Sequence, residues 1–195
     1  MGTVDIANDR TQAGAREAFE VFLSLEARSW KGANGTALLS DEDDAAFTRR
    51  LIGDLATHGN ASVALLRVDG KPIAAQVLLY SGSMAYTWKT AFDSAFAKYS
   101  PGALLIDKVT DELFDTQMIA AIESCSLENG FMAQLWTGRR ATVDMLVDVG
   151  AHKSFSFTLA AFGARGHAWL RERLHRLRAI NWPLLPKRNV AATRG

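Results

Sequence analysis

The chain has 195 residues, of which 48% are hydrophobic, so it can bury a substantial core and is not an intrinsically disordered protein. Its net charge of +1 hides an asymmetry, because residues 165–195 carry eight Lys or Arg and one acidic side chain, which places any contact with a polyanion at the C-terminal end. One cysteine, no signal-peptide pattern and no apolar run near the roughly 20 residues of a membrane helix together predict a cytoplasmic protein without a membrane span.

The first half of the chain has the pattern of two helices followed by an antiparallel meander. Apolar residues recur at helical spacing in the first helix, and Glu26 falls on the same face, one turn beyond Phe22. Asp69-Gly70 is a strong signal for a two-residue hairpin turn. The expected elements are a short strand at 3–6, helices at 15–28 and 40–58, and strands at 62–68, 72–80 and 84–92.

The stretch at 84–115 predicts a strand, a tight loop and a helix, and the rest of the chain is expected to support it. Ser100 suits the N-cap of this helix, and Pro101 suits its first position. The amides then left free to point outward are those of Gly102, Ala103 and Leu104. A helix start with free amides favours anions, so this loop predicts a phosphate-binding site.

The remaining elements are expected to complete one compact domain. They are a strand at 119–125, a helix from 138 or 139 to 149, a strand at 153–161 and a basic amphipathic helix at 164–180. The helix between the strands at 84–92 and 119–125 makes those strands parallel neighbours. The predicted fold class is therefore α/β (α+β), with a mixed, mainly antiparallel central sheet flanked by helices. We expect a single domain at 1–186 and a basic flexible tail at 187–195.

Several short segments carry a family resemblance in the same order as the elements. They are LEARSWKG at 25–32 with GTA at 35–37, DGKPIAA at 69–75, WKTAFD at 88–93, YSPG at 99–102 and LWTGRR at 135–140. Over residues 15–160 the chain resembles the GNAT acyltransferases, in particular the CelD/BcsL-like branch. That branch is associated with cellulose and exopolysaccharide biosynthesis and is related to the Fem-type aminoacyltransferases. Its members are usually longer, so the chain resembles their C-terminal half, and we expect it to act as a homo-oligomer or with an upstream GNAT-like half.

The resemblance implies an N-acyltransferase that uses acetyl-CoA or another acyl-CoA as cosubstrate. The acceptor would be an amine or amino sugar of exopolysaccharide or cell-envelope metabolism. In this fold the pyrophosphate of the cosubstrate lies on the helix after the fourth strand. The residues expected to bind it are Lys98, Tyr99, Ser100, Pro101, Gly102, Ala103 and Leu104. They stand where the family usually has Arg or Gln followed by a spaced pair of glycines.

The fourth and fifth strands of this fold separate at the thioester, so catalytic residues are expected on those strands and on the first helix. The candidates are Glu26, Lys89, Asp93 and Glu123, with Glu123 as the general base. Period-two alternation places Lys89 and Asp93 on one face of their strand and Trp88 on the other. Each candidate could instead belong to a structural ion pair: Glu26 with a nearby Lys or Arg at the rim of the core, Lys89 with Glu123, or Asp93 with Lys98.

A further set could bind a sugar or an anionic acceptor by stacking and charge, namely Trp30, Lys31, Trp136, Arg139 and Arg140, although Trp136 could equally be a core residue. The histidines show no metal-ligand spacing, so no metal site is predicted, and Cys125 is expected to be a buried thiol. We expect a small-molecule partner and no nucleic acid. Two alternatives stay open: a non-catalytic GNAT-like binding module, and a Fem-like transferase using aminoacyl-tRNA, for which the basic C-terminal helix is the local support.

Overall fold

The computed structural model describes residues 2–126, 130–143, 145–148, 150 and 154–180. The chain divides into two compact units, Met1–Arg139 and Arg140–Gly195. The first unit contains β1 (Val4–Asp9), α1 (Gln12–Ala27), α2 (Trp30–Ala33), η1 (Leu38–Ser40), α3 (Glu42–Thr57), β2 (Ala61–Val68), β3 (Lys71–Ser81), β4 (Met84–Phe92), η2 (Ser94–Tyr99), α4 (Pro101–Asp115), β5 (Ala121–Glu123) and α5 (Met132–Leu135). The second unit contains α6 (Phe155–Ile180). None of the helices in the described ranges combines the length and apolar character needed to cross a membrane.

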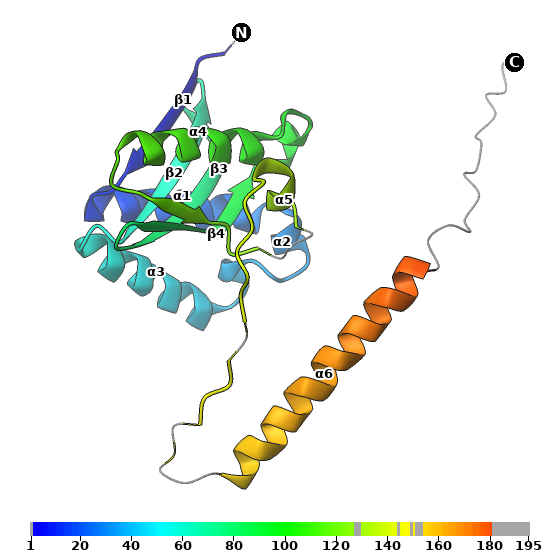
Figure 1. Ribbon diagram of the computed structural model, residues 1–195. Coiled ribbons are helices and arrows are strands. Elements are labelled where there is room, and N and C mark those ends of the chain that lie inside the picture. Colours follow the sequence, from blue (N-terminus) through cyan, green and yellow to red (C-terminus); the bar gives the residue numbers. More distant parts are fainter. Residues whose placement is uncertain (1, 127–129, 144, 149, 151–153, 181–195) are drawn as a thin grey trace, which may run out of the picture. The chain divides into compact units, whose positions relative to one another are not determined.

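The first unit is built on a five-stranded sheet in the order β1-β2-β3-β4-β5. The first four strands are antiparallel neighbours, and β5 pairs parallel with β4. Figure 1 shows α4 lying across one face of this sheet, with α1 and α3 on the other. The predicted fold class, a mixed, mainly antiparallel sheet flanked by helices, is confirmed.

The hairpin between β2 and β3 forms where the sequence predicts it. Asp69 and Gly70 both have positive φ values, 51° and 76°. A two-residue turn with two left-handed residues matches the right-handed twist of the flanking strands, which explains the preference for Asp-Gly here. This turn pairs Val68 with Lys71, and a β-bulge between Leu66 and Arg67 then shifts the register for the rest of the two strands.

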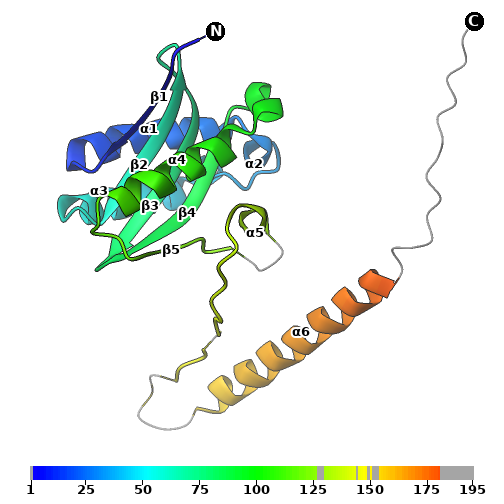
Figure 2. The same cartoon turned by 45° about the horizontal axis from the view of Figure 1, so that its top comes forward.

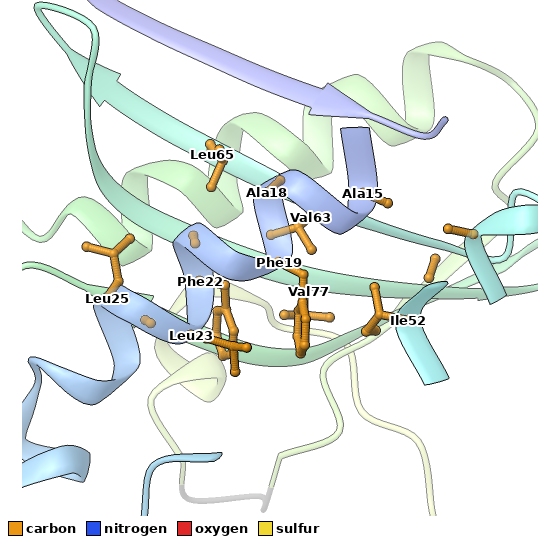
Figure 3. Packing of buried hydrophobic residues seen from close by; sticks show 14 residues of the cluster. Ala15, Ala18, Phe19, Phe22, Leu23, Leu25, Ile52, Val63, Leu65 and Val77 are labelled. Carbon is orange, nitrogen blue, oxygen red and sulfur yellow. The ribbon is translucent and has the colours of Figure 1, made fainter. Parts of the chain in front are cut away.

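Two hydrophobic clusters hold the helices to the sheet. On the α1 and α3 face, Phe19 and Phe22 stack with ring centroids 5.6 Å apart and pack over Val63 and Val77 (Figure 3). On the α4 face, the buried side of α4 packs on β2, β3 and β4. Each fully buried side chain of this size contributes about 1.5–3 kcal/mol, so the two layers keep the sheet rigid beneath any site built on it.

Two predictions for the second half of the chain are wrong. The helix expected from 138 or 139 to 149 is absent from the described residues 138–143 and 145–148. Its expected apolar face is exposed, with Val143 at 81% and Val147 at 69%, and an amphipathic helix is marginal without a surface to bury that face.

The strand expected at 153–161 is also wrong for its described part, because 155–161 is the first part of α6. Phe155, Phe157 and Leu159 alternate with serine and threonine, but so short an apolar pattern does not distinguish a strand from a helix. The helix predicted at 164–180 lies within α6 and is confirmed. Residue 153 and the predicted tail at 187–195 lie outside the described residues, and the single domain at 1–186 stays a prediction.

Candidate functional site

The candidate site begins where β4 and β5 part. β5 pairs only with the first residues of β4, from Met84 to Tyr86, whereas β4 continues to Phe92 (Figure 2). The amide of Asp93 donates to the carbonyl of Ile73 on β3. Because backbone groups alternate in direction along a strand, the backbone of Thr90 faces away from β3, toward the side on which β5 has ended. Beyond Tyr86, no strand in the described residues pairs with this edge of β4.

A β-bulge changes the direction of the side chains near this edge. Val77 pairs with Lys89 and Leu78 pairs with Thr87, which leaves Trp88 as an extra residue in β4. Trp88 packs against the cluster on the α1 face, and Lys89 reaches Glu26 on α1. The predicted alternation, which placed Lys89 and Trp88 on opposite faces, is therefore wrong at this position.

Glu26 lies at the centre of a charged cluster. It follows Phe22 by four residues on the buried stripe of α1 and is 0% exposed. Its Oε1 lies 3.1 Å from Lys31 Nζ and 3.4 Å from Lys89 Nζ, and its Oε2 accepts a hydrogen bond of 2.9 Å from the Leu38 amide. Both oxygens of Glu26 are thus engaged, so this carboxylate holds two ammonium groups from different segments in place.

Thr90 connects this cluster to the opposite face of the sheet. Its carbonyl accepts a hydrogen bond of 3.2 Å from Lys31 Nζ, and its hydroxyl donates to the side-chain oxygen of Gln76. Gln76 is fully buried in β3, and its side-chain nitrogen donates to the Val77 carbonyl at 2.8 Å. Sequence reasoning missed Gln76 and Thr90. The available signal was a polar residue within the apolar run at 73–78.

The start of α4 differs in detail from the prediction. Ser100 occupies the N-cap position in a left-handed conformation, φ 50° and ψ 51°, and its side chain makes no capping hydrogen bond. The Leu104 amide donates to the Ser100 carbonyl at 3.1 Å, so the expectation that this amide is free is wrong. Within the described part of the chain, the amides of Gly102 and Ala103 donate to no other group. Two amides at this helix start therefore have no partner among the described residues, and the Ser100 side chain does not contact them.

Gly102 packs closely on β4. A Cβ placed there would lie 3.4 Å from Thr90 Cγ2 and 3.5 Å from Phe92 Cδ1, which is ordinary van der Waals contact. The helix start therefore lies over the part of β4 that extends past β5. Any larger side chain at this position would press on the strand, whereas Ala103 is only half buried.

Asp93 has a structural role at the end of β4. Its carboxylate accepts a hydrogen bond of 3.0 Å from the Ala95 amide at the start of η2 and lies 3.5 Å from Lys71 Nζ. The Ala95 amide lowers the pKa of Asp93 most, with further contributions from Lys71 and Arg28. The structure does not bring Asp93 to Lys89, nor does it form the ion pair considered with Lys98.

Glu123 ends β5 at the point where the strands part. Ile122 packs in the cluster on the α4 face, so alternation directs Glu123 to the opposite face, which also carries Lys89. Its carboxylate makes no hydrogen bond or ion pair with another described residue, and the ion pair considered with Lys89 does not form.

Two residues after Glu123, Cys125 is exposed, so the expectation of a buried thiol is wrong. The pKa of this thiol is raised, first by partial burial and then by the charge of Glu123.

The remaining predicted residues fall in three places. Trp30 is 63% exposed at the start of α2, beside the Glu26 cluster in sequence. Lys98 Nζ lies 4.7 Å from the centre of the exposed Tyr99 ring, immediately before α4. In the segment after α5, Trp136 is half buried, and Arg139 donates to the backbone carbonyls of residues 133, 136 and 138. Arg140 is exposed and belongs to the second unit.

Across the described ranges, no three His, Cys, Asp or Glu side chains are grouped as metal ligands would be.

Sequence comparison relates the first two thirds of the chain to known proteins. A family model described as the acetyltransferase (GNAT) domain matches residues 1–123, which include the Glu26 cluster, the start of α4 and Glu123. No curated protein matches the chain.

Similar solved structures include several acetyltransferases. A possible acetyltransferase from Clostridium difficile 630 has a TM-score of 0.56 at 11% identity, covering 76% of this chain and 99% of that one. A GCN5-related N-acetyltransferase from Ralstonia eutropha JMP134 has a TM-score of 0.54 at 14% identity, covering 75% and 99%. An aminoglycoside acetyltransferase from an uncultured soil metagenomic sample, in complex with sisomicin, has a TM-score of 0.51 at 12% identity, covering 75% and 97%. At these identities the similarity shows a shared fold.

Proposed function

Because the chain belongs to the acetyltransferase (GNAT) family, and is thus an acyltransferase, we propose that it transfers an acyl group from acyl-CoA to the amine of a small acceptor. Acetyltransferases of this family use acetyl-CoA as cosubstrate. The observation that carries the proposal is the open edge of β4 beyond Tyr86, which lies beneath the start of α4 on one face and beside the Glu26 cluster on the other.

The pyrophosphate of the cosubstrate is proposed to bind at the start of α4. The amides of Gly102 and Ala103 and the positive end of the helix dipole favour an anion there. The left-handed Ser100 supports this role, since a non-glycine residue in that region carries strain of about 1–3 kcal/mol and such strain clusters at functional sites. Lys98, immediately before the helix, adds positive charge. The acyl chain would then run along the open edge of β4.

Glu123 is proposed as the general base. In the reaction the acceptor nitrogen attacks the thioester carbonyl, a C–N bond forms, the C–S bond breaks, and the proton released by the amine must be accepted nearby. Glu123 is a carboxylate without an ion-pair partner among the described residues, at the point where β4 and β5 part. Glu26 has both oxygens engaged, so its proposed role is to position Lys31 and Lys89 on the acceptor side.

The acceptor class is proposed from the resemblance to the CelD/BcsL-like branch. The segments at 25–32 and 88–93, which carry much of that resemblance, contribute all three members of the Glu26 cluster. The exposed Trp30 in the same segment offers a surface on which a sugar ring can stack. We therefore propose an amine or amino sugar of exopolysaccharide or cell-envelope metabolism as the acceptor.

Calorimetry with acetyl-CoA tests the cosubstrate site. Ala103→Asp places a carboxylate beside the amides proposed to hold the pyrophosphate, without pressing on β4 as a substitution of Gly102 would. We expect at least about tenfold weaker binding, equivalent to about 1.4 kcal/mol. Phe114→Asp, exposed near the far end of the same helix, adds the same charge as a control and should bind normally. Equal affinity in Ala103→Asp and Phe114→Asp would refute the site.

The chemical step is tested by amine-dependent release of free CoA. Glu123→Gln keeps the size of the side chain and removes the base, so we expect kcat to fall about 10²–10⁴-fold with acetyl-CoA binding unchanged. A kcat like that of the parent would exclude Glu123 as the base.

A further inference from the structure

The Glu26 cluster carries more positive than negative charge. One carboxylate oxygen, Glu26 Oε1, is shared by the ammonium groups of Lys31 and Lys89, and the other oxygen is taken by the Leu38 amide. Lys31 also donates to the Thr90 carbonyl, whereas the only described oxygen within hydrogen-bonding distance of Lys89 Nζ is Glu26 Oε1. An ammonium group has three N–H donors, so Lys89 keeps donors for a ligand.

Two ammonium groups that contact the same oxygen are close enough to repel each other. Their side chains retain 23% and 25% of their surface, so water reaches them while the carboxylate between them is fully buried. A second anion bound from the solvent side would balance the remaining charge and accept charge-assisted hydrogen bonds, which are stronger than those between neutral groups. The cluster therefore has the chemistry of a site for phosphate or carboxylate oxygens.

Glu123 adds a negative charge to the face of the sheet that carries Lys89. It pairs in register with Tyr86, and Lys89 follows Tyr86 by three residues, a distance of about 10 Å along the strand. Both side chains are long and point to the α1 face, so a small molecule can reach the ammonium group of Lys89 and the carboxylate of Glu123 together. A molecule with an amine at one end and an anion at the other matches this arrangement of charges.

We propose that the acceptor carries an anionic group, phosphate or carboxylate, in addition to its amine, and that Lys89 together with Lys31 binds that group. The inference rests on the proposed function, because it takes the amine of the acceptor to lie at Glu123. Lys89 is then a determinant of acceptor specificity, and Glu26 positions it through Oε1.

Matched pairs of acceptors test the proposal in the full chain with acetyl-CoA. Glucosamine 6-phosphate against glucosamine tests a phosphate, and 6-aminohexanoate against hexylamine tests a carboxylate. We expect kcat/KM for at least one anionic member to exceed that of its neutral partner by about tenfold or more. In Lys89→Gln this ratio should fall to near one, and Lys89→Arg, which keeps the charge, should restore most of it.

Direct binding of the same compounds separates this inference from the proposed function. Calorimetry without acetyl-CoA should show tighter binding of the anionic member to the parent chain, lost in Lys89→Gln, with thermal unfolding confirming that the variant is folded. Transfer to amines with equal kcat/KM within both pairs would overturn the inference and leave the proposed function standing. Absence of acetyl-CoA binding and of transfer would overturn the proposed function, while the binding preference would still support or refute the anion site.

Discussion

Glu26→Gln tests whether one buried carboxylate holds two lysines in place. The substitution keeps the shape of the side chain but replaces a shared carboxylate by one oxygen and one NH₂ group. Glu26 is 0% exposed, and its oxygens meet two ammonium groups and the Leu38 amide, all of which are donors. The new NH₂ group must therefore face another donor, and the two lysines lose the charge that balanced them.

The expected cost follows from this burial. Removing one member of a buried ion pair costs about 3–5 kcal/mol. Because Lys31 and Lys89 keep 23% and 25% of their side-chain surface, water compensates part of the loss, and we expect the free energy of unfolding to fall by about 2–4 kcal/mol. That is a large share of the about 5–15 kcal/mol typical of a folded domain.

Urea denaturation followed by circular dichroism measures this change, and α1 itself provides the control. Glu20 pairs with Arg49 at 2.6 Å, but these side chains are 54% and 43% exposed, so Glu20→Gln should cost no more than about 1 kcal/mol. Adding Lys89→Met to Glu26→Gln should cost less than the two single changes together, because each removes the same contact. A loss for Glu26→Gln no larger than that for Glu20→Gln would refute the reasoning.

Three further changes have defined outcomes. Thr90→Val should lower the free energy of unfolding by about 1–3 kcal/mol, because the buried Gln76 oxygen loses its donor; a neutral result in urea denaturation would contradict that bond. The pKa of Asp93 is lowered by the amide that it caps, so its stabilising effect is complete above the ordinary pKa of about 4 and is lost as the pH falls through the lowered value. Asp93→Asn should therefore flatten the dependence of the urea midpoint on acidic pH, and a dependence as steep as that of the parent would argue against it. Glu123→Gln should speed alkylation of Cys125 by iodoacetamide near about pH 8, since burial first and then the Glu123 charge raise the pKa of this thiol; an unchanged rate would show that the charge does not reach it.

The sheet could be predicted from the sequence because its signals are local. Asp69-Gly70 specifies a turn that few other dipeptides can form, and the strands on either side of it follow from alternation. The segments after Gly138 carried equally regular apolar patterns, yet those patterns did not decide between helix, strand and irregular structure. Such patterns stabilise an element only when another surface covers the apolar side, and the sequence does not state which surface that is.

The candidate site was predictable only in part. The position of Glu26 follows from helical spacing, since it lies one turn after Phe22. Its partners do not follow, because the bulge that turns Lys89 toward α1 depends on the pairing of β4 with β3. The Leu38 amide and the Thr90 carbonyl are backbone groups, so no side-chain pattern identifies them. The left-handed conformation of Ser100 was equally hidden, as glycine or asparagine would be the usual residue there.

The hydrogen bond from Lys31 to the Thr90 carbonyl has a consequence for solubility. A strand that extends past its neighbour exposes backbone donors and acceptors, and such an edge can recruit a strand from another molecule and start aggregation. The proposed function requires this edge of β4 to stay open for the acyl chain, so a longer β5 could not cover it. Instead, the ammonium group of Lys31 in α2 donates a hydrogen bond to one of these carbonyls, that of Thr90. The hydrogen bond between Lys31 and Thr90 therefore also disfavours the addition of a foreign strand to this edge while no substrate is bound.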